Sequence, residues 1–226
     1  MTASKGTANG RNALPNGPCR PRLSDGPAEP RGVRQARPPY DIDRLTDVAL
    51  SVFAERGFDG ASMDNVATKA GITKAAIYHH VSGKDELLER GLNRALEALF
   101  GVLGEPGAAV GKPIERLRFI VHRVAALAVA LRPELTVLVR VRGNTAVERQ
   151  AIVKRRNFDA AVAQLVRDAQ ADGSLAGDLD AGVVVRLVFG MCNSLVEWYR
   201  PGGALPPEAI AATVVRLVFD GAATRA

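Results

Sequence analysis

Apolar residues recur at helical spacing along most of the chain from about residue 41 onward. Between Asp41 and Arg56 they form one inward stripe, made of Ile42, Leu45, Ala49, Val52 and Phe53. The segment from Lys84 to Leu103 carries a leucine stripe of the same period. Further helices are predicted over 113–131, 133–142, 145–171, 180–199 and 206–220, and no strand pattern competes with them. The chain is therefore predicted to be all-α.

Two short helices joined by a tight turn are predicted between the first two long ones. Ser62 is placed to cap a helix that carries Val66 and Ala67 inward. Gly71 stands where a helix-to-helix turn needs a residue that tolerates positive φ, and a second helix follows from about Thr73 to His80. This arrangement predicts a module that reads DNA.

The charge pattern after this turn favours the same interpretation. No acidic residue occurs between Asn65 and Lys84, so one surface is expected to approach phosphates without repulsion. Ser82, with Asp85 three residues later, is typical of a capping box that starts the next helix.

These residues resemble the TetR family of bacterial transcriptional regulators, and the resemblance extends upstream through ALSVFAERGFDGASMDNVATKAGI. The positions that fit the family pattern are Ala49, Phe53, Gly57, Phe58, Ser62, Met63, Ile72, Tyr78 and Lys84. Val81 departs from it, since the family commonly has Phe there, but both are apolar and suit a core position. The detailed match covers roughly residues 42–95. It implies an N-terminal three-helix, helix-turn-helix DNA-binding domain, followed by a C-terminal helical ligand-binding and dimerisation domain.

Candidate DNA contacts follow from the places that residues occupy in this motif, and each has a simpler competing role. Ser62 and Thr73 could simply cap helices, Tyr78 could simply pack in the core, and Lys74 and Lys84 could be ordinary solvated charges. His80 is expected to face away. The predicted DNA-binding residues are Arg44, Ser62, Thr73, Lys74, Tyr78, His79 and Lys84.

Composition divides the chain into three segments. Residues 1–39 hold seven of the 13 prolines and are predicted to be a disordered basic arm. Residues 1–40 also supply +5 of the net charge of +6, whereas 41–103 hold seven basic and ten acidic residues, so the DNA contact must be a local patch. The predicted DNA-binding domain with its connecting helix spans 40–103. The glycines and prolines of GEPGAAVGKP separate it from a regulatory and dimerisation domain over 112–226.

The arm carries Arg31, Arg34 and Arg37 just before the first helix. Arginines in such a position can reach a minor groove or flanking phosphates. A solvated tail, or a start codon placed too far upstream, are the alternatives.

Two apolar stripes near the C-terminus predict a homodimer, in which they would pair as a four-helix bundle. They could instead pack on the subunit's own core. The predicted interface residues are Val184, Val188, Met191, Leu195, Ile210, Val214, Leu217 and Val218. Dimerisation has an independent reason, because two recognition helices held about a helical turn apart read a palindrome with combined affinity.

The helices from 113 to 171 are apolar with scattered polar residues, as in a bundle that encloses a ligand cavity. Candidate ligand contacts are Arg118, His122, Arg140, Asn144, Asn157 and Trp198. His122 could equally be a core or boundary histidine. The stretch VEWYRPGGALPPEAI resembles part of TetR-type regulators of fatty-acid, steroid and aromatic-acid catabolism, several of which respond to acyl-CoA thioesters. An acyl-CoA effector is therefore expected, with a free fatty acid or a hydrophobic drug as competitors.

The resemblance implies a ligand-responsive regulator, a repressor in the simplest form, that binds a palindromic operator as a dimer and is released by its effector. An activator, or an adaptor whose headpiece no longer binds DNA, are the alternatives. An enzyme is not expected, because the chain has three histidines, no cysteine pair with metal-ligand spacing and no glycine-rich phosphate loop. No cofactor or metal is predicted.

A cytoplasmic location is expected. The N-terminus lacks the apolar segment of a signal peptide, and the longest fully apolar run, Val124 to Leu131, is too short to span a bilayer. Two cysteines without an obvious reason to pair fit a reducing compartment.

Overall fold

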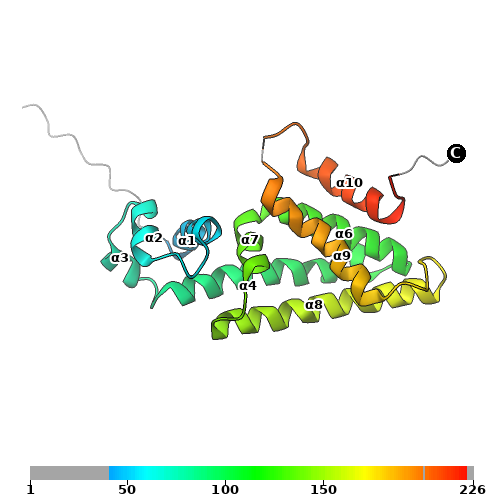
Figure 1. Cartoon of the computed structure of the whole chain (residues 1–226), viewed down its shortest axis with the longest axis horizontal. Coiled ribbons are helices and arrows are strands. Elements are labelled where there is room, and N and C mark those ends of the chain that lie inside the picture. The colour runs from blue at the N-terminus through cyan, green and yellow to red at the C-terminus, as the bar shows by residue number, and fades with distance from the viewer. Residues whose placement is uncertain (1–40, 201, 223–226) are drawn as a thin grey trace, which may run out of the picture. The chain divides into compact units, whose positions relative to one another are not determined.

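The computed structural model describes residues 41–200 and 202–222, so the predicted arm and its arginines lie outside the described residues. Within the described ranges the chain is helical with no strand, which confirms the all-α prediction (Figure 1). The helices are α1 (Ile42–Arg56), α2 (Met63–Ala70), α3 (Lys74–Tyr78), α4 (Lys84–Gly104), α5 (Pro106–Ala109), α6 (Pro113–Ala130), α7 (Arg132–Arg140), α8 (Ala146–Ala171), α9 (Ala181–Trp198) and α10 (Pro207–Phe219).

The predicted helix boundaries agree with the structure to within about two residues, with one helix missed. The segment GEPGAAVGKP contains the short helix α5, which begins at Pro106. Ala108 is buried there, and Gly107 packs so closely on Phe119 of α6 that a Cβ would lie 2.5 Å from the Phe119 ring. The break in the pattern is therefore a packed corner between α4 and α6.

The N-terminal helices α1, α2 and α3 pack on the first turns of α4, and their buried residues form one end of a core that continues into the rest of the chain. Leu45, Phe53, Ile77 and Val81 are nearly or fully buried in it, as predicted for Val81. Phe53 meets Phe58 edge-on, with ring centroids 5.2 Å apart. This group of elements, residues 41–83, is called the headpiece below.

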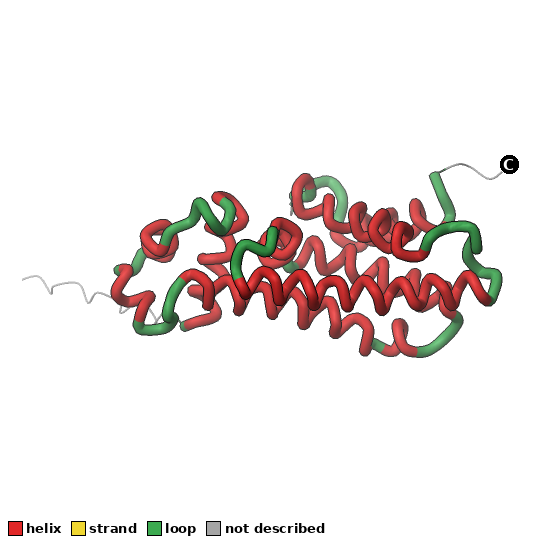
Figure 2. The backbone as a smooth tube through the Cα atoms, turned by 60° about the horizontal axis from the view of Figure 1, so that its bottom comes forward, coloured by secondary structure: helices red, strands yellow, loops and turns green. Residues whose placement is uncertain are grey.

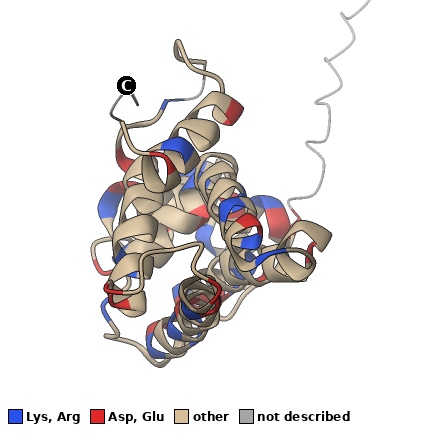
Figure 3. Ribbon diagram, turned by 90° about the vertical axis from the view of Figure 1, so that its right-hand side faces the viewer, with Lys and Arg blue, Asp and Glu red and all other residues tan. Residues whose placement is uncertain are grey.

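The C-terminal helices form a bundle in which α6, α8 and α9 pack on one another and α10 lies on α6. The long helices α4 and α8 run side by side (Figures 1 and 2). Phe158 of α8 stacks on Phe189 of α9 in the interior, with ring centroids 5.4 Å apart. Seen from the end of the bundle, positions of Lys and Arg are interspersed with positions of Asp and Glu along the helices (Figure 3).

Helix α4 joins the headpiece to the bundle. Near its start, Gly91 lies directly under the buried side chain of Leu50 of α1. One turn further, Arg94 donates hydrogen bonds of 2.6 Å to both Asp43 and Asp47 of α1. A glycine contact and a forked ion pair thus hold α1 on α4.

Helix α9 is, by length and composition alone, apolar enough to cross a membrane, with a mean hydropathy of 1.3 over 18 residues. The core helix of a soluble protein can pass the same test, and α9 packs on α6 and α8 along one side. Its other side is exposed.

Candidate nucleic-acid interface and ligand cavities

The two helices of the predicted DNA-reading module are held by their predicted caps. Ser62 caps α2: its Oγ accepts the Asn65 N–H at 3.2 Å, and the Asn65 Oδ1 accepts the Ser62 N–H at 3.0 Å. Gly71 ends α2 in the left-handed conformation, with φ 70° and ψ 30°. The Thr73 Oγ1 then accepts the Ala76 N–H at 3.1 Å and starts α3. The turn geometry therefore follows the sequence closely.

Helix α3 shows one side to the headpiece core and the other to solvent. Ile77 is fully buried, and it anchors the helix on α2. Thr73, Lys74, His79 and the 49 % exposed Tyr78 face outward. His80 is also exposed, so the structure does not separate it from His79. The exposed side chains offer hydroxyl, ammonium, phenol and imidazole groups, all of which can bond phosphates or base edges.

Lys74 pairs with an acidic residue that lies just outside the acid-free stretch noted in the sequence. Its Nζ lies 2.9 Å from the Oδ2 of Asp64, one residue before the acid-free stretch begins. The hydrogen bond from Lys74 to Asp64 raises the pKa of the ammonium above its usual value. Both side chains are largely exposed, so a DNA phosphate could exchange with the Asp64 carboxylate.

Lys84 is directed inward to the loop between α1 and α2. Its Nζ donates to the carbonyl oxygens of Phe58 at 3.1 Å and Ala61 at 3.3 Å, and it lies 4.4 Å from the centroid of the Phe58 ring. In these contacts the side chain faces the headpiece loop and not solvent, and its phosphate contact stays a prediction. The ammonium ties α4 to the headpiece loop, since backbone carbonyls and an aromatic face are ready acceptors for it.

The capping partner predicted after Ser82 is also corrected. The carboxylate that returns to Ser82 belongs to Glu86, whose Oε2 accepts the Ser82 N–H at 2.8 Å and the hydroxyl at 3.0 Å. Asp85 makes no such bond, because Gly83 occupies the cap position and shifts the frame by one residue. The backbone and side-chain bonds from Ser82, with the bond from Arg90, lower the pKa of Glu86.

Arg44 is exposed in the first turn of α1, where its backbone N–H is capped by Asp41. Its contact with DNA stays a prediction, as do those of the outward-facing residues of α3.

The predicted dimer residues divide by burial, and three of them fit the alternative of packing within the subunit. Leu195, Ile210 and Val214 are at most 5 % exposed, so they belong to the subunit's own core. Val184, Val188 and Val218 are half-buried, and Met191 and Leu217 are exposed. The exposed apolar stripe of α9 runs through Val183, Leu187 and Met191; Val183 and Leu187 each lie one residue before a predicted position, and Met191 was predicted. Both sides of α9 are apolar, so periodicity alone could not decide which side faces solvent.

The predicted ligand contacts are mostly engaged at the surface. Arg118 pairs with Asp220, and His122 Nε2 lies 3.4 Å from Glu208. Asn157 is exposed, and the Trp198 ring is 55 % exposed with its N–H donated to Ser194. These four residues do not line the cavities described next, so nothing in the described part of the structure brings them to a ligand site, and their contact with a ligand stays a prediction.

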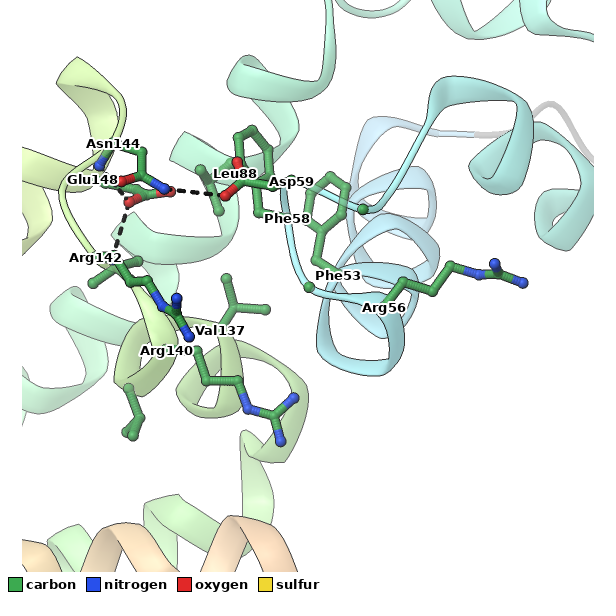
Figure 4. Close-up of a pocket in the computed structure, with 14 residues that line it drawn as sticks. Phe53, Arg56, Phe58, Asp59, Leu88, Val137, Arg140, Arg142, Asn144 and Glu148 are labelled. Atoms are coloured by element: carbon green, nitrogen blue, oxygen red, sulfur yellow. Dashed lines mark hydrogen bonds between the residues drawn. The ribbon is translucent and has the colours of Figure 1, made fainter.

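Arg140 and Asn144 do line a cavity. It has a volume of about 570 Å³ and lies between the headpiece and the segment that joins α7 to α8 (Figure 4). Arg140 donates to the Ala54 carbonyl at 2.6 Å and to Glu197 at 2.9 Å, and Asn144 Nδ2 donates to Asp59 at 3.0 Å. We call this space the junction cavity.

Two further cavities lie within the bundle. One of about 250 Å³ is lined only by apolar side chains of α6, α8, α9, α10 and the segment before α9, among them Leu179 and Leu187. The other, of about 30 Å³, lies among Leu99, Leu138 and Phe158 and is called the interior cavity. Its wall includes Asp159, whose pKa is raised by burial. The bundle thus offers apolar space with few polar groups.

Comparison with known proteins matches both parts of the chain. Residues 45–90 match the model described as bacterial regulatory proteins, tetR family. Residues 110–222, half of the chain, match the tetracyclin repressor-like C-terminal domain. The chain belongs to the TetR family. Members of this family are transcriptional regulators, and the helix-turn-helix described above is its DNA-binding element.

Several relatives extend over nearly the whole chain. A TetR-family regulator from Streptomyces coelicolor A3 is 46 % identical, with a TM-score of 0.76 over 86 % of this chain and 96 % of that one. The transcriptional repressor KstR2 of Mycolicibacterium smegmatis is 27 % identical over 205 residues, which cover 87 % of this chain and 94 % of the repressor. The structure of AibR with isovaleryl coenzyme A and operator DNA shares the fold, with a TM-score of 0.69 at 22 % identity over 78 % of this chain and 97 % of that one.

Sequence reasoning passed over three features of this TetR-family chain. Asp64 was outside the stretch searched for acids. Arg56 was given no role, and Arg142 was only one of the scattered polar residues of the bundle, although both line the junction cavity. Periodicity could not have revealed the pair, because they are 86 positions apart and only the fold brings their segments together.

Proposed function

We propose that this chain is a repressor that binds a palindromic operator as a homodimer through α3 and is released by a hydrophobic effector, for which an acyl-CoA thioester is the first candidate. The observation that carries the proposal is the solvent-facing side of α3, where Lys74, Tyr78 and His79 project from a helix that Thr73 caps at its start. Repressors such as KstR2 among the relatives support it. The division into an arm over 1–39, a DNA-binding domain over 40–103 and a regulatory domain over 112–226 is part of the proposal, as is a cytoplasmic location.

The test of DNA binding is a mobility shift with fragments from upstream of the protein's own gene and its neighbours, with excess competitor DNA. The Lys74→Ala and Tyr78→Ala variants should weaken a specific shift at least tenfold, because each removes a group aimed at the DNA. Arg167→Ala, an exposed arginine on α8, serves as the control and should leave the shift unchanged. If all variants bind the DNA equally well, α3 is not the element that recognises the operator.

For the dimer, we propose that the exposed stripe of α9 meets its copy across a two-fold axis, with Leu217 of α10 beside it. Leu187 is 70 % exposed and Met191 37 %, an apolar surface that a partner would bury. Leu187→Glu should therefore shift the mass in solution from dimer to monomer in light scattering. Val153→Glu, on an apolar residue of α8 that is 55 % exposed, is the matched control. Dimers that survive Leu187→Glu would move the interface elsewhere.

The effector is tested by adding acyl-CoAs, free fatty acids and hydrophobic drugs to the protein–operator complex. A tenfold loss of operator affinity needs only about 1.4 kcal/mol of differential binding, so a small displacement of α4 is enough. Release by one class identifies the effector. The alternative function, an adaptor that does not bind DNA, is favoured if no fragment gives a salt-sensitive specific shift.

A further inference from the structure

We propose that the junction cavity binds the phosphate-bearing part of the effector, as in the nucleotide of a coenzyme A thioester, through Arg56 and Arg142. This inference rests on the proposed function, since it assigns a place to the effector's anionic group. It concerns the space between the headpiece and the segment after α7, outside the apolar interior of the bundle.

The position of the cavity makes it sensitive to the headpiece. One wall is formed by the end of α1 and the loop after it, residues 56–60, and the other by the end of α7 and residues 140–144 (Figure 4). Its volume of about 570 Å³ falls in the range of sites that hold nucleotide-sized ligands. The interior cavity, of about 30 Å³, has room for roughly one water molecule.

Most polar groups of the cavity wall are already engaged. The buried carboxylate of Glu148 accepts the backbone N–H groups of Arg142, Gly143 and Asn144 through one oxygen, at 2.7–3.0 Å. The Asp59 carboxylate is bonded by the amide of Asn144. The negative charges of the wall are therefore held by local donors.

The guanidinium groups of Arg56 and Arg142 are different. Over residues 41–200 and 202–222, neither has a hydrogen bond or ion pair. Arg140, between the two walls, is engaged by the Ala54 carbonyl and by Glu197, yet its charge adds to the same field. In Figure 4, Arg142 and Arg140 come from the α7 side, while Arg56 extends outward from α1 at the opposite side. Unengaged, exposed guanidinium groups at the rim of a cavity favour a dianionic phosphate or diphosphate, with which they form paired hydrogen bonds.

The junction cavity also has apolar side chains in its wall. Val139 of α7 lines both the junction cavity and the interior cavity. The junction cavity wall also contains Phe53, Leu88 and Val137, so a ligand with phosphates at Arg142 can place an apolar group against these side chains. A coenzyme A thioester has this combination of a polyanionic end and an apolar end, whereas a free fatty acid lacks the polyanionic end.

Binding there would act on the headpiece directly. Phosphates held by Arg142 and by an Arg56 side chain turned toward the cavity would bridge the two walls and favour one separation between them. The Arg140 contacts with Ala54 and Glu197 span the same junction, so the ligand would bias elements that already hold the headpiece.

The test is isothermal titration of the full-length protein with free coenzyme A, a panel of acyl-CoAs and the matching free acids. We expect coenzyme A to bind the wild type with an affinity that falls as salt rises. Arg142→Ala and Arg56→Ala should each weaken coenzyme A and acyl-CoA binding at least tenfold, and Arg142→Lys less than Arg142→Ala. Arg156→Ala, an exposed arginine of α8 that lines none of these cavities, is the control and should stay within twofold. Thermal melts confirm that each variant is folded.

Three results would overturn the inference. If Arg56→Ala and Arg142→Ala bind coenzyme A as tightly as the wild type, the phosphates bind elsewhere. If Arg156→Ala loses as much affinity as these two variants, the loss reflects net charge and not a specific site. If free acids bind and coenzyme A does not, the effector has no polyanionic part and the inference is wrong. Specific operator binding in the mobility shift would still support the proposed regulator in that case. Failure of operator binding with intact, arginine-dependent coenzyme A binding would instead contradict the proposed function alone.

Discussion

Replacing Gly91 by alanine should destabilise the protein, although alanine is the better helix former. A Cβ added at Gly91 would lie 2.2 Å from Leu50 Cδ2 and 2.9 Å from its Cδ1 and Cγ. Normal contacts between carbon atoms are about 3.5–4.0 Å, and the fully buried Leu50 has no open space into which to rotate. Gly91→Ala therefore forces α1 away from α4.

Two free-energy terms decide whether Gly91→Ala stabilises or destabilises the protein. The gain in helix propensity from glycine to alanine is about 1 kcal/mol, whereas an extra methyl in a packed core costs about 1–3 kcal/mol. The overlap at Gly91 is severe, so we expect the upper end of that cost and a net loss of about 2 kcal/mol. For a chain of this size the melting temperature should then fall by roughly 4–8 °C.

The same helix provides the control. Gly101 of α4 is exposed, and a Cβ there would meet no atom within 4 Å, so Gly101→Ala should gain up to about 1 kcal/mol and raise the melting temperature. Both variants are melted at one protein concentration, because the stability of a dimer depends on it. A higher melting temperature for Gly91→Ala would refute the reasoning. In a Leu50→Ala background the penalty at Gly91 should disappear, as a double-mutant cycle would show.

Three further predictions concern single groups. Glu148→Ala should cost about 2–4 kcal/mol in urea unfolding, because three backbone N–H groups lose one charged acceptor; a cost below about 0.5 kcal/mol would contradict this. Asp64→Asn should strengthen operator binding in a mobility shift, since Lys74 is no longer paired; weaker binding would show that the pair orders α3. In a Cys19→Ser background the thiol of Cys192 should resist labelling at pH 8 until the protein unfolds, since burial raises its pKa to about 12. Rapid native labelling would contradict that burial. The raised pKa also means that stability is lost as the pH rises from about 9 toward 12, because the unfolded thiol ionises first.

The sequence was sufficient where a single local interaction determines structure. Ser62, Gly71 and Thr73 each act within four residues of themselves, and all three hold the predicted places. The pairing of Ser82 with Glu86 differs from the prediction because Gly83 adopts an extended, non-helical conformation and delays the start of α4 by one residue. A capping pattern fixes the partner only when the first helical residue is known.

Contacts between distant segments could not be predicted in the same way. α9 is apolar on both sides, so the choice between Leu195 and Leu187 as the exposed residue depends on where α6 and α8 lie. Lys84 reaches two carbonyls more than 20 positions earlier in the chain, which no pattern of residue types shows. The junction cavity likewise exists only because α7 packs on α1.

The anchoring of α4 at its far end has a mechanical consequence. Glu105, directly after the helix, accepts three hydrogen bonds of 2.9–3.1 Å from Arg123 of α6, and Arg116 donates to the Ala108 carbonyl at 2.6 Å. A helix of 21 residues held at that end is a lever roughly 30 Å long. A tilt of about 5° around the fixed corner would displace the headpiece end by nearly 3 Å, the size of a hydrogen bond to DNA. The corner at α5 would thus convert a small angular change in the bundle into the loss of a whole set of contacts at the operator.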